Sequence, residues 1–329
     1  MNNAGYAAHM KAIAIPPHVK LVIGLAAAAA LAQSPAPFAQ TSCPQHYAGA
    51  PPQLVNVKLQ AKTRELCSTQ FAVLHSGITR TPIYSAELLT RETVRDAKEQ
   101  VRYSTFHPDP RLPADERSDL RDFVRSGFDR GHMAPSGNMP TLEAQQESFA
   151  LSNMIPQYPQ NNRYLWAGIE SATRQMAKKA TRLYVISGAM FTGAQIKTVG
   201  GRVMVPTHLF KAIYNPKTGE AAAYLVRNDG GGQYAMVDLA TIERLSRIRP
   251  FSGAKFRVSE MALPAPITRG SKASGYQRVT AESIMMTGNG YGSAAPDKNS
   301  HKHPMAFANL GLHPASQMVQ TVFKQFLQK

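Results

Sequence analysis

The sequence predicts an α+β fold in which helices flank an antiparallel or mixed sheet, and three observations support this. Segments of strand length, rich in β-branched and apolar residues, occur at residues 70–75, 181–190, 203–211 and 221–226. Residues 215–219 (NPKTG) separate the last two segments and are typical of a hairpin turn. Helical patterns occur at residues 236–245 and 317–327. No internal repeat or Gly/Ser linker divides them, so we expect one domain at residues 61–329.

The first 39 residues have the composition of an export signal. Lys11 and Lys20 precede an uncharged apolar run of 12 residues at 21–32, and small residues suited to signal peptidase follow it. The run is too short to cross the hydrocarbon core of a bilayer as a helix. We therefore expect residues 1–39 to be a signal peptide that is removed. The mature protein would be secreted or periplasmic, without stable membrane association.

Both cysteines of the chain, Cys43 and Cys67, lie just after this predicted signal. In an oxidising compartment an even pair of cysteines is typical of one disulfide bond, although two unrelated buried thiols are the alternative. Residues 40–60 are rich in Pro and Ala and are predicted to be an extended segment that precedes the domain.

Three further segments have recognisable local patterns. Residues 89–103 are predicted to form a polar helix, whereas residues 107–115 contain three prolines and must be a loop. Residues 270–303 are rich in Gly, Ser, Lys and His without a clear period, which indicates a long loop. His301 and His303 in this loop suggest a metal site, but two histidines in a polar loop are usually solvated.

The chain is strongly basic, with 37 Lys and Arg against 21 Asp and Glu, a formal charge of +16. Removal of residues 1–39 takes away two basic and no acidic residues, which leaves 35 against 21, or +14. This excess favours a polyanionic partner such as nucleic acid or an anionic membrane surface. An ordinary basic secreted protein is the alternative on charge alone.

Residues 126–140 (SGFDRGHMAPSGNMP) bring charged and titratable side chains together. In the segment after them, four side chains recur at intervals of four positions: Asn162, Trp166, Glu170 and Arg174. In a helix this spacing places all four in one stripe. A plain amphipathic helix with an ion pair between Glu170 and Arg174 is the alternative.

Together the two segments fit a metal-assisted phosphodiester hydrolase. Such an enzyme needs a base that activates water, a hard cation on a phosphate oxygen, and positive groups for the extra charge of the transition state. A histidine, an asparagine and several arginines of these segments are suited to these roles.

The sequence Asp129-Arg130-Gly131-His132 resembles the DRGH signature of non-specific DNA/RNA endonucleases with a ββα-metal site, the endonuclease G-like group. In that family an LSN-x-x-PQ segment precedes an asparagine, a tryptophan and a glutamate on one helix. The corresponding residues here are Leu151, Ser152, Asn153, Pro156, Gln157, Asn162, Trp166 and Glu170. The resemblance covers residues 79–226 and implies a ββα-metal finger set on the larger sheet.

The resemblance also implies residue roles. His132 would be the general base, and Asn162 the one direct side-chain ligand of Mg²⁺, for which Mn²⁺ is a substitute. Activity would rise as His132 loses its proton, near its ordinary pKa of about 6.5 unless the metal and arginines lower it. Glu170 would hold a metal-bound water.

The remaining assignments each have an alternative. Arg130 and Arg174 would stabilise the pentavalent phosphorane, although Arg130 would otherwise simply pair with Asp129. Asn153 would orient His132 or the scissile phosphate, although capping of a turn also explains an asparagine. Arg102 is a further candidate for a phosphate contact upstream of the motif.

The resulting hypothesis is an exported, magnesium-dependent, sugar-non-specific endonuclease that hydrolyses DNA and RNA, with a homodimer as one expected assembly. Two alternatives remain at this point: a basic nucleic-acid-binding protein without catalysis, and a small-molecule phosphodiesterase. A binding protein has no need of His132, Asn162 and Glu170 in register, and a small-molecule enzyme has no obvious need of +14 charge.

Overall fold

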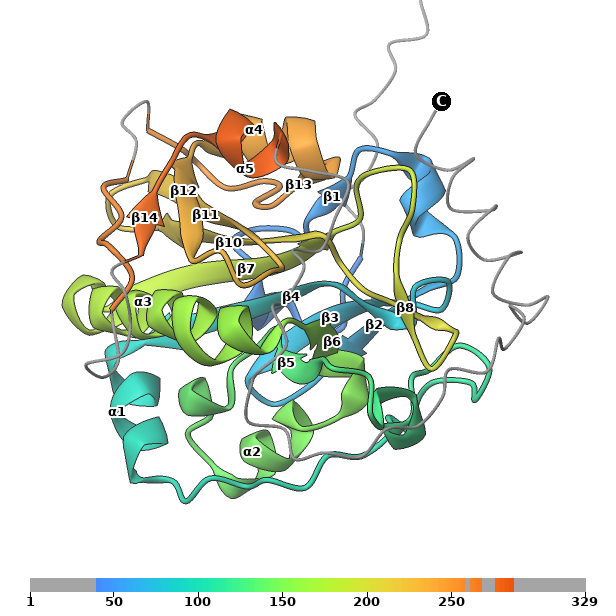
Figure 1. The fold of residues 1–329 in the computed structure, drawn as a ribbon. Helices are drawn as coiled ribbons and strands as arrows, with labels where there is room; N and C mark the ends of the chain where they lie inside the picture. The colour runs from blue at the N-terminus through green and yellow to red at the C-terminus, as the bar shows by residue number, and fades with distance from the viewer. Residues whose placement is uncertain (1–39, 258–260, 268–275, 287–329) are drawn as a thin grey trace, which may run out of the picture. The chain divides into compact units, whose positions relative to one another are not determined.

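The computed structural model describes residues 40–257, 261–267 and 276–286, which all belong to one compact unit, Phe38–Lys329 (Figure 1). The predicted signal peptide, the predicted helix at 317–327, His301 and His303 lie outside the described residues. The described part of the predicted loop at 270–303 contains β14 (Gln277–Arg278) and α5 (Ala281–Met286). No helix among the described residues is long and apolar enough to span a membrane.

An eight-stranded sheet organises this unit, in the order β14-β12-β11-β10-β7-β4-β3-β2. Neighbouring strands are antiparallel except β12 and β14, which are parallel. Apart from β14, the strands of this sheet are, in chain order, β2 (Thr63–Cys67), β3 (Phe71–Ser76), β4 (Thr81–Thr90), β7 (Arg182–Met190), β10 (His208–Asn215), β11 (Glu220–Arg227) and β12 (Gln233–Val237). The sheet is mixed and helices flank it, so the predicted α+β class is confirmed.

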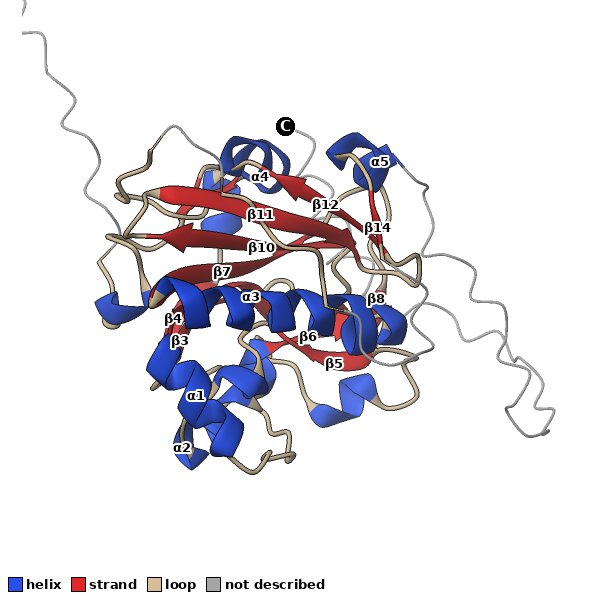
Figure 2. Cartoon of the chain, turned by 90° about the vertical axis from the view of Figure 1, so that its left-hand side faces the viewer, coloured by secondary structure: helices blue, strands red, loops and turns tan. Residues whose placement is uncertain are grey.

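Side chains alternate between the two faces of the sheet, and each face has its own apolar core. In β7, Leu183 and Val185 belong to one core, whereas Tyr184 and Ile186 belong to the other. The first core lies under α3 (Ala167–Ala180) and α1 (Arg91–Glu99). The second lies under α4 (Leu239–Ser246) and α5. Figure 2 shows α3 lying across its face of the sheet.

Local signals explain where the elements begin and end. The predicted helix at 89–103 is the shorter α1, because Thr90 and Thr93 form a capping box at its start. The helix predicted at 236–245 is α4, which begins later because Asp238 caps it and residues 236–237 belong to β12. Thr141 caps α2 (Leu142–Ser148) in the same way. The proline-rich residues 107–115 form a loop.

The segment predicted as one strand at 203–211 is instead two strands. β9 (Val203–Met204) pairs with β8 (Thr198–Val199), and β10 begins at His208. Pro206 lies between them and has no backbone N–H to donate, so it interrupts the pairing. The predicted hairpin turn is present, with Asn215 opposite Glu220 in the register of β10 and β11.

β4, which lies between β7 and β3, has no clear apolar pattern in the sequence. Ser85 and Glu87 alternate with apolar residues and share the face of Leu89, so they are buried toward the α3 side. Because two residues on its core face are polar, this strand lacks the alternation of apolar residues by which a strand is predicted from sequence.

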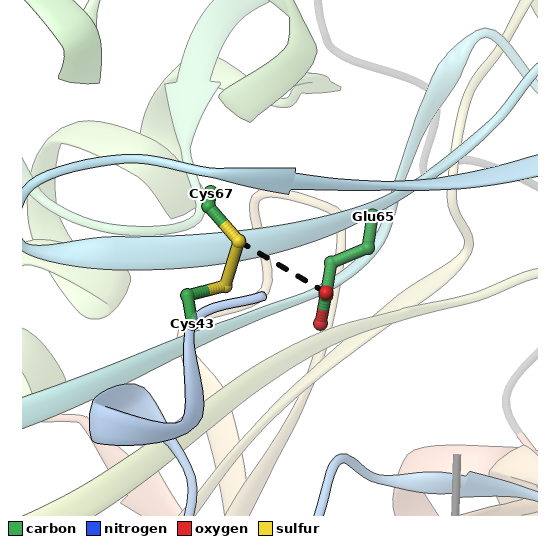
Figure 3. A group of neighbouring side chains, drawn as sticks. All are labelled: Cys43, Glu65 and Cys67. Carbon is green, nitrogen blue, oxygen red and sulfur yellow. Dashed lines mark hydrogen bonds between the residues drawn. A yellow bond between two sulfur atoms is a disulfide. The ribbon is translucent and has the colours of Figure 1, made fainter. Parts of the chain in front are cut away.

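The N-terminal segment packs on the domain through a short strand and the predicted disulfide. Cys43 is bonded to Cys67 at the end of β2, with the Cα atoms 5.8 Å apart (Figure 3). Beside the disulfide, Glu65 accepts hydrogen bonds from the Tyr47 hydroxyl at 2.8 Å and the Thr41 hydroxyl at 2.8 Å. β1 (Gln53–Leu54) pairs with β13 (Ile248–Arg249), and the 3-10 turns η1 (Pro44–His46) and η2 (Val57–Gln60) complete the segment.

Candidate active site

A ββα finger presents the DRGH motif on the α3 side of the sheet. β5 (Asp129–His132) pairs antiparallel with β6 (Met154–Gln157), with Asp129 opposite Gln157 and His132 opposite Met154. The chain then enters η6 (Asn161–Trp166), a π-helical turn that continues into α3. The predicted ββα arrangement is therefore present, with β5 and β6 beside α3 (Figure 2).

The glycine of the motif is explained by close packing within the finger. A Cβ atom at Gly131 would overlap the side chain of Gln157 on the partner strand. The Gln157 amide donates to Asn161 Oδ1 at 2.6 Å, and Asn161 Nδ2 donates to the backbone oxygen of Arg227 at 2.8 Å. These contacts tie the finger to β11 of the large sheet.

Asp129 joins the start of the finger to the helical turn that follows it. Its carboxylate accepts a hydrogen bond from Asn162 Nδ2 at 2.9 Å and two from the Arg163 guanidinium, at 2.7 and 2.8 Å. Burial opposes ionisation, but these bonds outweigh it and lower the pKa of Asp129. Arg130 does not take this partner; its guanidinium lies 4.1 Å from the centre of the Phe106 ring.

The finger and α3 line one side of a cleft of about 650 Å³. Its lining includes four arginines and two carboxylates, which makes it electropositive: Arg102, Arg130, Arg163, Arg174, Asp129 and Glu170. Arg102, the predicted candidate for a phosphate contact, therefore lines the cleft. Arg163 and Phe106 also line it, but no sequence motif points to them, because the folded chain and not a motif brings them to the cleft.

His132 ends β5 and is almost fully buried at 9% exposure. Its ring packs edge-on against Phe149 at 4.7 Å between centres, and its backbone oxygen accepts from Trp166 Nε1 at 3.4 Å. Among the described residues, none forms a hydrogen bond with His132 Nε2. Burial, aided by the nearby charge of Arg102, lowers the pKa of His132 to about 3, below the value near 6.5 that the sequence suggests.

The predicted helical stripe is interrupted by the π-turn. Asn162, Glu170 and Arg174 line the cleft, but Trp166 is 1% exposed and turns inward. A π-turn bonds residues five apart, so it shifts the helical phase by one residue. Ala167, five residues after Asn162, lines the cleft in place of Trp166.

Asn153 lies behind the finger rather than in the cleft lining. Its side chain is fully buried, with Oδ1 accepting from the Ala134 N–H at 2.9 Å and Nδ2 donating to the oxygens of Ala134 and Ser148, both at 2.9 Å. These partners occupy both ends of its amide. In this position Asn153 acts on His132 only through the backbone that follows β5.

The side chains present fit a sparsely held magnesium ion. The nitrogen of Asn162 is committed to Asp129, which leaves the amide oxygen for the cleft, where Glu170 also lies. Oxygen ligands suit Mg²⁺, which keeps several of its waters when it binds proteins. Among the described residues, the one tight group of three metal-ligating types is Cys43, Glu65 and Cys67. Its sulfur atoms are joined in the disulfide and are therefore not thiolate ligands.

Known proteins share both the sequence and the fold. The chain is 36% identical over 155 residues to Nuclease 1, mitochondrial, of Schizosaccharomyces pombe, covering 43% of this chain and 48% of the relative. It is 34% identical over 166 residues to Nuclease C1 of Cunninghamella echinulata var. echinulata, covering 47% of this chain and 66% of the relative. The chain thus spans between about half and two thirds of these relatives' lengths.

A solved structure supports the same relationship. A chain in the crystal structure of the EndoG/EndoGI complex superposes with a TM-score of 0.52 at 26% identity. The match covers 56% of this chain and 84% of that one. Residues 50–256, more than half of the sequence, match the family of DNA/RNA non-specific endonucleases. With the DRGH finger in place, this chain belongs to that family.

Proposed function

We propose that this protein is an exported, magnesium-dependent endonuclease that hydrolyses phosphodiester bonds of both DNA and RNA. The observation that supports this most is the neutral, buried His132 at the same cleft as Asn162, Glu170 and several arginines. The cleft combines a proton acceptor, oxygen donors for a hard cation and positive charge for a polyanion.

Each side chain has a role that follows from its position. His132 accepts the proton of the attacking water, because it lines the cleft and burial keeps its ring neutral. Asn162 would hold Mg²⁺ directly and Glu170 would hold one of its waters; the bound ion would supply positive charge that polarises the scissile phosphate. Arg130 and Arg174 neutralise the charge that develops on the phosphate oxygens in the transition state.

The composition of the N-terminal residues supports the proposed export. Residues 1–39 contain no arginine and one apolar run, which favours a secretory signal over the Arg-rich amphipathic type of a mitochondrial transit peptide. The Cys43–Cys67 disulfide agrees with an oxidising compartment.

Intact mass spectrometry of the protein purified from the cells that produce it and from their medium tests the proposed export and disulfide. We expect an N-terminus between residues 33 and 40 and a mass reduced by the hydrogens of both thiols, because export and disulfide formation share a compartment. Reductant should restore those hydrogens. A chain that retains residues 1–32, or that has two free thiols, contradicts the proposal.

Replacement of the base separates catalysis from binding. His132→Ala should lower the cleavage rate of plasmid DNA and of total RNA by about 10²–10⁴-fold, because the water loses its proton acceptor. Its DNA affinity should stay near that of the wild type and fall steeply with salt, because dispersed Lys and Arg contacts provide the binding. Added imidazole should partly rescue cleavage.

The control for that variant is His107→Ala, since His107 lies outside the cleft lining and bonds the backbone oxygen of Gln146. Cleavage by His132→Ala at the wild-type rate would show that another group is the base. Binding without cleavage by the wild type would instead favour the binding-protein alternative.

The metal requirement is tested by chelation and titration. Excess EDTA should abolish cleavage and Mg²⁺ or Mn²⁺ should restore it, because a sparsely ligated site exchanges its ion readily. Asn162→Ala should raise the Mg²⁺ concentration for half-maximal rate by about tenfold or more, as expected when a group that supports a metal is lost. Asn215→Ala, in the β10–β11 hairpin, is the matched control. Full activity in EDTA would rule out the metal mechanism.

The pKa of His132 is open to direct measurement. A histidine of ordinary pKa, about 6.5, is roughly nine-tenths protonated at pH 5.5. Because burial disfavours the charged ring, His132 should remain neutral at that pH in ¹⁵N-histidine NMR spectra of the protein without substrate. Assignment uses His132→Ala. Titration of the ring between pH 6 and 7 would mean that the cleft is more hydrated than its packing indicates.

A further inference from the structure

A buried pair of charged residues lies between the sheet and α3, beneath the cleft. Glu87 of β4 and Lys211 of β10 are each 1% exposed and face the same side as the α3 core. Lys211 Nζ donates to the Ser187 hydroxyl and lies 4.9 Å from the centre of the Trp166 ring. Burial raises the pKa of Glu87 to about 7, although the charge of Lys211 and a hydrogen bond from Asn138 favour its ionised form.

Asn138 links this buried carboxylate to an arginine of the cleft. Its Nδ2 donates to Glu87 Oε1 at 3.0 Å, and its Oδ1 accepts from the Arg174 guanidinium at 3.1 Å. Asn138 is 4% exposed, whereas Arg174 is half-buried and lines the cleft. A continuous path of hydrogen bonds therefore runs from β4 to the cleft.

The order of donors and acceptors in this path gives it a direction. In its ionised form the Glu87 carboxylate can only accept hydrogen bonds, so in that form it faces the nitrogen of the Asn138 amide, as observed. The amide oxygen then necessarily faces the other way, toward Arg174, which can only donate. Glu87 thus selects the one amide orientation that provides an acceptor for the guanidinium.

The turn that holds Asn138 is itself fixed. In η4 (Ser136–Asn138), the Ser136 hydroxyl donates to Gln145 Oε1 at 2.9 Å. The Gln145 side-chain amide donates in turn to the backbone oxygen of Ser136 at 2.6 Å. A Cβ atom at Gly137 would lie 3.3 Å from an Arg174 nitrogen, so the guanidinium packs closely on this turn. Arg174 therefore has a rigid support from α2 and β4.

We propose that Asn138, oriented by the buried carboxylate of Glu87, is a positioning residue that holds Arg174 at the scissile phosphate. An arginine loses considerable rotamer freedom when it is fixed, and a support in place before substrate binds removes that cost from the reaction. This inference rests on the proposed nuclease function, because it assigns a partner to a cleft arginine of that reaction.

An exchange of isosteric residues tests the direction of the path. Asn138→Asp places a carboxylate against that of Glu87, so above the Glu87 pKa of about 7 kcat should fall by about tenfold or more as the support is disturbed. In the double variant Glu87→Gln/Asn138→Asp, the new amide of residue 87 donates to the new carboxylate, which still accepts from Arg174. We expect kcat to recover to within about threefold of the wild type, because both hydrogen bonds are restored.

A double-mutant cycle tests whether Asn138 acts through Arg174. Asn138→Ala and Arg174→Ala should each lower kcat by about tenfold or more, with a smaller change in KM, because the contact matters in the transition state. Adding Asn138→Ala to Arg174→Ala should cost less than threefold more, since the arginine to be positioned is gone.

The hairpin residues Asn215 and Glu220 allow the same substitutions as a control, because they are opposite each other in β10 and β11 and do not line the cleft. Asn215→Asp and Glu220→Gln/Asn215→Asp should leave kcat unchanged. Thermal unfolding of every variant identifies those that lose the fold. If folded Asn138→Asp keeps wild-type kcat, or the exchange fails to recover it, the positioning role is wrong. If the wild type cleaves neither DNA nor RNA, the proposed function fails instead.

Discussion

The hydrogen bonds between Asp129 and the turn that begins with Asn161 determine the geometry of the site. Asp129 and His132 stand at opposite ends of β5, about 10 Å apart along an extended strand. Because Asp129 also holds Asn162 and Arg163, the strand that places His132, the proposed base, also places Asn162, the proposed metal ligand. Neither residue can shift without the other, and the tether through Gln157 and Asn161 extends this constraint to the large sheet.

Burial of Glu87 and Lys211 is costly, because two charges removed from water regain their hydration energy only with good geometry and further hydrogen bonds. A pair of apolar residues would serve the core at least as well. Glu87 of this pair is linked through Asn138 to the cleft arginine Arg174, so its position is better explained by the orientation of these polar groups than by stability. Glu87, together with Ser85, also makes β4 inconspicuous in the sequence.

The sequence identifies side chains that chemistry requires, but not the contacts that hold them. His132, Asn162, Glu170 and Arg174 could be selected from residue type and spacing, and all four line one cleft. Trp166 has the same spacing, yet its side chain turns inward, because the π-turn shifts the helical phase. A spacing of four residues in the sequence does not reveal such a turn. Partners far apart in sequence, such as Arg163 with Asp129, depend on strand pairing that no local pattern specifies.

Burial affects His132, the proposed base, in two opposing ways. Desolvation keeps the ring neutral, but it also weakens the attraction of the ring for a proton. A phosphodiester in the cleft brings a negative charge close to the ring, and a nearby anion favours the imidazolium form. By this argument a bound substrate would raise the proton affinity of His132. As the proposed base, His132 would then be strongest when the water beside the phosphate must give up its proton, and weakest when the cleft is empty.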